Sequence, residues 1–146
     1  MNFTTKSRYA VNALADLEYL SNYESPVALK DIADRQGIDL TYLEQLFRKL
    51  RIAGIVKSVR GRNGGYVYAT TPQDISIKNI MDAVEENLDA TKCAGTSSCH
   101  SGQQCNSHKL WDDLNNVVDK FLSDISIIDI VEKLKDPYIH LKEIRQ

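Results

Sequence analysis

The chain has 146 residues, of which 42% are hydrophobic and 26% charged, and its formal net charge is −2. These values are ordinary for a soluble globular protein of one domain, or of a compact domain with a helical appendage. No apolar run approaches the roughly 20 residues that span a bilayer and the first residues carry no secretory signal, so we expect a cytoplasmic protein without a membrane partner.

Three helices are predicted in the first third of the chain. Apolar residues recur at helical spacing over residues 8–20, then over a short segment, 29–36, and again in a longer helix that begins at Leu40. Gly37 closes the short helix because glycine tolerates the left-handed conformation, and Gly54 ends the longer one. A short helix, a glycine turn and a longer helix form the helix-turn-helix pattern.

A β-hairpin should follow directly. Residues 55–59 and 66–70 are rich in β-branched and aromatic residues, and they flank the glycine-rich sequence RGRNGG. A hairpin placed after a recognition-type helix is a wing, and its tip would present Arg60 and Arg62. The fold class is therefore mainly α: a winged helix-turn-helix with a small β-hairpin wing and a long C-terminal helix.

Further helices are predicted in the second half. One covers residues 76–86 with Ser76 as N-cap. The long helix has an apolar stripe that is either monomer core or a dimer seam: Leu110, Leu114, Val117, Phe121 and Ile125. A last short helix starts near Ser126, and the tail from Asp136 is weakly patterned.

The predicted recognition helix carries a candidate surface for DNA. Residues 45–73 hold six basic residues and no acid, so this stretch could face phosphates. The outward positions at its start are suited to base edges, because glutamate can accept from cytosine and glutamine can pair with adenine. The candidates for DNA contact are Thr41, Tyr42, Glu44, Gln45, Arg48, Lys49, Arg51, Arg60 and Arg62. Arg48, Lys49 and Arg51 are better suited to phosphates than to bases.

Glu44 allows a second interpretation. The sequence TYLE fits a capping box in which Thr41 caps the helix and Glu44 reaches back to the cap residue. Sequence alone leaves base contact and capping equally weighted.

All three cysteines lie in one glycine- and serine-rich segment. The spacing C-x5-C-x5-C-x2-H offers Cys93, Cys99, Cys105 and His108 as ligands for zinc, copper(I) or an iron–sulphur cluster. Gaps of five residues favour a cluster over structural zinc, which usually uses closer pairs. His100 competes as a ligand, but we rank His108 higher because it starts the long helix. A metal-free thiol sensor is the main alternative.

No catalytic motif occurs in the sequence, so we expect no enzyme activity.

Three stretches carry a specific resemblance over residues 3–135. TTKSRYAVNAL, the segment from Leu29 to Tyr66 and the cysteine–histidine spacing resemble the bacterial IscR-type iron–sulphur cluster regulators. These regulators are winged-helix transcription factors that dimerise through the long helix, here about residues 108–124. The wing tip departs from the family's pattern, with Arg62-Asn63 where Pro-Gly is more common.

The resemblance implies ligand roles and DNA-contact roles for individual residues. It makes Cys93, Cys99, Cys105 and His108 the ligands of a [2Fe-2S] cluster. It also places Thr41, Glu44 and Gln45 on base edges and Arg60 in the minor groove. The implied activity is transcription regulation, as repressor or activator, of cluster-biogenesis and related genes by a homodimer on double-stranded DNA, with a cluster-assembly scaffold as a further candidate partner.

The corresponding organisation has four parts. Residues 1–72 are the DNA-binding domain, 73–91 a connecting helix, 92–108 the cluster-binding loop, and 109–146 the dimerisation helix with the C-terminal helix and tail. We expect cluster loading to decide whether Glu44 faces DNA or is tied back in its capping box. The alternative function is a nitric-oxide-, zinc- or thiol-based sensor on the same scaffold.

Overall fold

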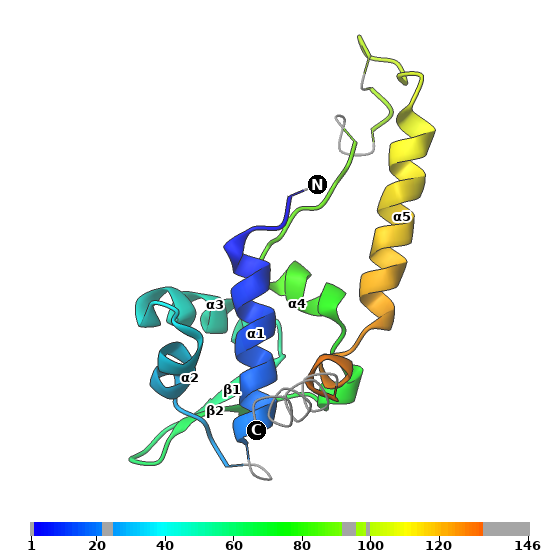
Figure 1. Ribbon diagram of the computed structural model, residues 1–146. Helices are drawn as coiled ribbons and strands as arrows, with labels where there is room; N and C mark the ends of the chain where they lie inside the picture. Colours follow the sequence, from blue (N-terminus) through cyan, green and yellow to red (C-terminus); the bar gives the residue numbers. More distant parts are fainter. Residues whose placement is uncertain (1, 22–24, 92–95, 99, 133–146) are drawn as a thin grey trace, which may run out of the picture.

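The computed structural model describes residues 2–21, 25–91, 96–98 and 100–132. The elements follow one another as α1 (Thr5–Leu20), α2 (Leu29–Gln36), α3 (Leu40–Ile52), β1 (Val56–Val59), β2 (Gly65–Tyr68), the 3-10 turn η1 (Pro72–Asp74), α4 (Ile77–Ala83) and α5 (His108–Asp124) (Figure 1). A further helical segment covers residues 127–132. The predicted tail from Asp136 lies outside the described residues.

The helix-turn-helix is formed by α2 and α3, as the sequence predicted. Gly37 ends α2 in the left-handed conformation, with φ 65°, and the backbone N–H of Ile38 donates to the carbonyl of Ala33 at 3.0 Å. This closure turns the chain within three residues. The apolar stripe of α3 is buried against α1 and α2: Leu43, Leu46, Phe47 and Leu50. Burial of each such side chain contributes about 1.5–3 kcal/mol to folding.

The start of α3 corrects one prediction. Asp39 is the N-cap, and its carboxylate accepts from the backbone N–H of Tyr42 at 3.0 Å. Thr41 is already the second residue of the helix, so the predicted capping box of Thr41 and Glu44 is wrong. Asp39 takes the position because its side chain reaches the free N–H groups of the first turn from outside the helix.

The wing is an antiparallel hairpin in which Val56 faces Tyr68 and Val59 faces Gly65. Val27, just before α2, forms a β-bridge with Tyr66 that the sequence did not reveal. A Cβ at Gly65 would lie 2.3 Å from the carbonyl oxygen of Val27. Glycine is therefore required where the two backbones meet.

Two backbone hydrogen bonds join the end of α5 to the start of α4. The N–H of Ile77 donates to Ile125 at 2.9 Å, and the N–H of Ile127 donates to Ile75 at 3.0 Å. Ser76 caps α4, as predicted, and pairs reciprocally with Asn79. Ile127 and Val131 enter the core that α1 to α4 form. The C-terminal end of α5 is thus fixed to the DNA-binding part of the molecule.

The rest of α5 stands away from that core (Figure 1). Its apolar stripe is not monomer core, which was one of the two predicted alternatives. The large exposed side chains on α5 are Leu110, Trp111, Leu114, Val117 and Phe121. Val117 and Phe121 are 66% and 62% exposed. We call these five residues the α5 apolar face.

Candidate nucleic-acid interface and cysteine loop

The exposed face of α3 carries four of the residues predicted to contact bases and phosphates. Thr41, Glu44, Gln45 and Arg48 are all exposed, whereas the apolar stripe of the same helix is buried. Residues at these spacings project from one side of a helix. The structure therefore brings together a hydroxyl, an amide, a carboxylate and a guanidinium on a single accessible surface.

Tyr42 is held by α1 and is only partly accessible. Its ring packs edge-on against Tyr9, with 5.9 Å between the ring centroids. Its hydroxyl lies 3.3 Å from that of Thr5. These contacts attach the first turn of α3 to the first half of α1.

The two basic residues near the end of α3 differ in their surroundings. Lys49 forms an ion pair with Glu85, at 3.1 Å between Nζ and Oε2. Arg51 is exposed. Any contact of Lys49 with a phosphate would therefore compete with Glu85.

At the wing, Arg60 and Arg62 are both exposed on the connection between β1 and β2. The tip is closed by a hydrogen bond from Gly64 N–H to the carbonyl of Gly61 at 3.0 Å. Tyr68 fixes the other end of the hairpin, because its hydroxyl donates to the backbone carbonyl of Leu14 in α1. Burial raises the pKa of Tyr68, so this hydroxyl keeps its proton.

The structure describes two of the four predicted cluster ligands. His108 is the first residue of α5, as predicted, and it is 7% exposed. Cys105 is partly buried one turn earlier, and its carbonyl accepts from the His108 N–H at 3.2 Å. Cys93 and Cys99 lie outside the described residues. His100, the competing ligand, is exposed in a tight turn whose backbone pairs it with Gln103 at 2.7 and 2.8 Å.

Cys105 and His108 are compatible with an iron–sulphur cluster. A thiol and an imidazole three residues apart, bracketing a turn, supply soft and borderline donors from a short segment. Nε2 of His108 lies 3.4 Å from the hydroxyl of Ser97, so the ring faces the cysteine-bearing loop. Among the described residues no three His, Cys, Asp or Glu side chains gather around one point, and the remaining predicted ligands are Cys93 and Cys99.

The segment that leads from α4 to this loop is fastened to the middle of α5. We call residues 85–91 the connecting segment. Asn115 donates to the carboxylate of Asp89 at 2.7 Å and accepts from the N–H of Ala90 at 2.8 Å. Hydrogen bonds from the side chain and backbone of Thr91, and from Asn115, lower the pKa of Asp89.

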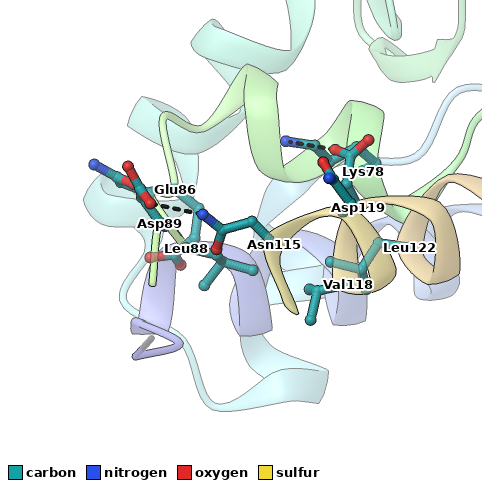
Figure 2. A pocket seen from close by; sticks show the side chains of 10 residues that line it. Lys78, Glu86, Leu88, Asp89, Asn115, Val118, Asp119 and Leu122 are labelled. Atoms are coloured by element: carbon teal, nitrogen blue, oxygen red, sulfur yellow. Dashed lines mark hydrogen bonds and ion pairs between the residues drawn. The ribbon is translucent and has the colours of Figure 1, made fainter. Parts of the chain in front are cut away.

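A pocket of about 370 Å³ lies beside these contacts, between the connecting segment and α5. Figure 2 shows Asp89 and Asn115 pointing toward one another on one side of it, and Lys78 and Asp119 meeting on the other. Lys78 bonds Asp82 at 2.7 Å and Asp119 at 3.5 Å, and its pKa is raised mainly by the hydrogen bond to Asp82. Sequence patterns did not identify the bonds that Asn115 and Asp119 make, because each joins residues far apart in the chain.

The fold and the exposed surface of α3 define the class of the protein: it is a winged helix-turn-helix transcription regulator and not an enzyme. Within the described part of the chain, no helix is both long and apolar enough to cross a bilayer.

Comparison with known proteins gives the family. The Rrf2 family, described as iron-dependent transcriptional regulators, matches residues 3–133. The IscR transcriptional regulator of Vibrio atlanticus is 48% identical over 132 residues, which cover 90% of this chain and 76% of the relative. A putative regulator of Azotobacter vinelandii is also 48% identical, over 91% of this chain and 80% of its own.

Two solved structures share the fold closely. IscR of T. potens superposes with a TM-score of 0.75 at 33% identity, covering 94% of this chain and 90% of that chain. CymR, the global cysteine regulator of B. subtilis, superposes with a TM-score of 0.78 at 28% identity, covering 91% and 98%. The chain belongs to the Rrf2 family, and within it the chain resembles IscR.

Proposed function

We propose that this protein is a cytoplasmic, homodimeric regulator that binds a [2Fe-2S] cluster and controls cluster-biogenesis and related genes. The observation that carries the proposal is the position of His108. A buried imidazole at the first residue of a long helix, one turn after Cys105, is a rigid partner for ligands in the preceding loop. The identity to IscR proteins of several bacteria supports the same assignment.

Cys93, Cys99, Cys105 and His108 would hold the cluster. Cysteine thiolates are its usual ligands, and histidine can replace cysteine on one iron. When bound, the cluster supplies a group whose presence depends on iron, sulphide and oxidation state. The protein's own part is to keep His108 unprotonated and oriented at the start of α5, because a protonated imidazole cannot bind metal.

DNA binding would use both copies of the α3 surface. Thr41, Glu44 and Gln45 are proposed for base edges, Tyr42, Arg48, Lys49 and Arg51 for the DNA backbone, and Arg60 and Arg62 for the minor groove or phosphates. The α5 apolar face would form the dimer contact. In a symmetric dimer the two half-sites should lie about one helical turn apart, roughly 34–36 Å, or a multiple of that.

The capping-box state of Glu44 is not part of this proposal. Asp39 occupies the cap position, so Glu44 has no cap residue at Thr41 to which it could be tied. Its exposed carboxylate favours the base-contact interpretation, in which cytosine is accepted and phosphates are repelled.

The experiment is anaerobic reconstitution of the full chain, wild type beside His108→Ala. We expect visible charge-transfer absorption with iron and acid-labile sulphide in equal amounts for the wild type, and a less stable or altered chromophore for the variant. His100→Ala is the matched control and should behave as wild type. A colourless protein that retains zinc, or one that binds neither metal nor sulphide, would instead support the zinc- or thiol-based sensor. A cluster with four irons would support the nitric-oxide sensor.

A further inference from the structure

The N-terminus of α1 lacks the usual stabilising groups of its own. Thr4 is the N-cap but its side chain makes no capping hydrogen bond, and the first turn contains no acidic residue. Free N–H groups at a helix start require acceptors, and a negative charge there is favourable. In this protein both are supplied by Glu86 of the connecting segment, 82 residues away in sequence from Thr4.

One carboxylate oxygen of Glu86 receives several of these bonds. Its Oε2 accepts from the backbone N–H of Thr4 at 3.1 Å, from the hydroxyl of Thr4 at 2.6 Å and from the hydroxyl of Ser7. Partial burial acts to raise the pKa of Glu86, but the bonds from Ser7 and Thr4 outweigh it and lower the pKa overall. We call this arrangement the Glu86 clamp.

The Glu86 clamp acts on the same part of α1 that holds α3. Thr5 and Tyr9 are the residues that contact Tyr42, and Thr4 and Ser7 lie beside them at the start of α1. Tyr42 in turn is the third residue of α3, next to Thr41 and one turn from Gln45. A displacement of the first turns of α1 would therefore move the start of α3.

The other side of the clamp leads to α5. Three residues after Glu86, Asp89 bonds Asn115 in the middle of α5, and the same helix begins at His108. The residue before Glu86 is Glu85, which pairs with Lys49 on α3. The connecting segment thus contacts α1, α3 and α5 within five consecutive positions.

We propose that Glu86 is a positioning residue for DNA binding: by clamping the first turn of α1 to the connecting segment, it fixes Tyr42 and hence the DNA-facing start of α3. The inference rests on the proposed role of α3 in DNA binding. It does not require the cluster, because every contact in it is made by side chains of this chain.

The test uses the cluster-free full chain and a DNA duplex that the wild type selects from random sequences. Glu86→Ala and Ser7→Ala should each weaken binding by roughly 2- to 30-fold, the range of changes made along a coupled series of contacts. Glu86→Gln should restore part of the loss, since its amide oxygen can still accept. Asp82→Asn, which removes a carboxylate of α4 that bonds Lys78 and not α1, is the matched control and should change little.

A double-mutant cycle separates positioning from general stability. In a Tyr42→Ala background, Glu86→Ala should cause no further loss of affinity, because the side chain it positions is absent. Amide hydrogen exchange of residues 40–45 in free protein should also be faster in Glu86→Ala. Equal affinity of wild type, Glu86→Ala and Ser7→Ala, or additive losses in the cycle, would overturn the inference alone. A wild type that selects no duplex would overturn the proposed DNA-binding surface, and this inference with it.

Discussion

Asp39 and Thr41 differ by two positions, and that difference decides what Glu44 can do. The carboxylate of Asp39 accepts from the first turn of α3, so Thr41 and Glu44 are left as exposed residues of the helix. Asp39→Ala should therefore reduce the free energy of unfolding by about 0.5–2 kcal/mol, the usual cost of removing an N-cap. Thr41→Ala should change it by less than about 0.5 kcal/mol. Urea denaturation of both variants measures the difference, and a larger reduction for Thr41→Ala would contradict the observed cap.

Glu86 is a second residue whose contribution depends on long-range contacts. Because its pKa is lowered in the folded state, its ionised form stabilises the fold at neutral pH. This contribution is present above the unfolded pKa and is lost as pH falls through the lower folded pKa. We expect Glu86→Gln to have a lower Tm than wild type at pH 7, with the two values converging as the pH falls through that range. A Tm difference that is constant with pH would show that the charge is not involved.

At the scale of elements, α5 is the helix whose apolar residues the monomer leaves uncovered. If the α5 apolar face forms a twofold interface, Phe121 is buried in both copies, and removing about 1.5–3 kcal/mol per copy raises the dissociation constant at least about a hundredfold. Phe121→Asp should therefore give monomers in analytical ultracentrifugation while keeping the helical circular-dichroism signal. Asn116→Asp introduces the same charge at an exposed polar position of α5 and should remain dimeric. Unchanged association of Phe121→Asp would exclude this face.

The wing and α3 act together at the scale of the whole molecule, because both present basic residues from one domain. Arg48→Ala should weaken binding to every duplex and reduce the slope of log affinity against log salt by about one for each phosphate that the variant no longer neutralises, thus about two per dimer. Glu44→Ala should instead alter the ranking of duplexes, with relaxed preference at a single base position of each half-site. Competition binding over a salt series distinguishes the two. A Glu44→Ala protein with unchanged ranking would remove the base-contact role.

The connection between the two ends of the molecule is also a property of the whole. His108 begins α5 at one end, whereas the C-terminal end of the same helix is bonded to α4 and the core. Figure 1 shows α5 beside the DNA-binding domain, joined to it at this second end, while the connecting segment runs from α4 past the start of α1 toward the cysteine loop. Two routes thus lead from the cysteine loop to α3, and the Glu86 clamp lies on the shorter one.

Much of the local structure could be predicted because its causes are local. The stripe of Leu43, Phe47 and Leu50 determined a helix, Gly37 determined its predecessor's end, and Ser76 determined the start of α4. The spacing of the cysteines with His108 is likewise a sequence property, although Cys93 and Cys99 lie outside the described residues. Such signals are readable since helix periodicity, glycine's positive φ and N-capping involve residues within one or two turns of each other.

By itself, the sequence determined the helix-turn-helix, the wing, the beginning of the long helix at His108 and the family resemblance. Only the tertiary structure decided that Asp39 caps α3, that Val27 meets Gly65, that the apolar residues of α5 are exposed, and that Glu86 binds the start of α1. The reason is physical: most of these contacts depend on how elements pack across the domain, and a carboxylate near the end of α4 has no local feature that specifies a helix start 82 positions earlier.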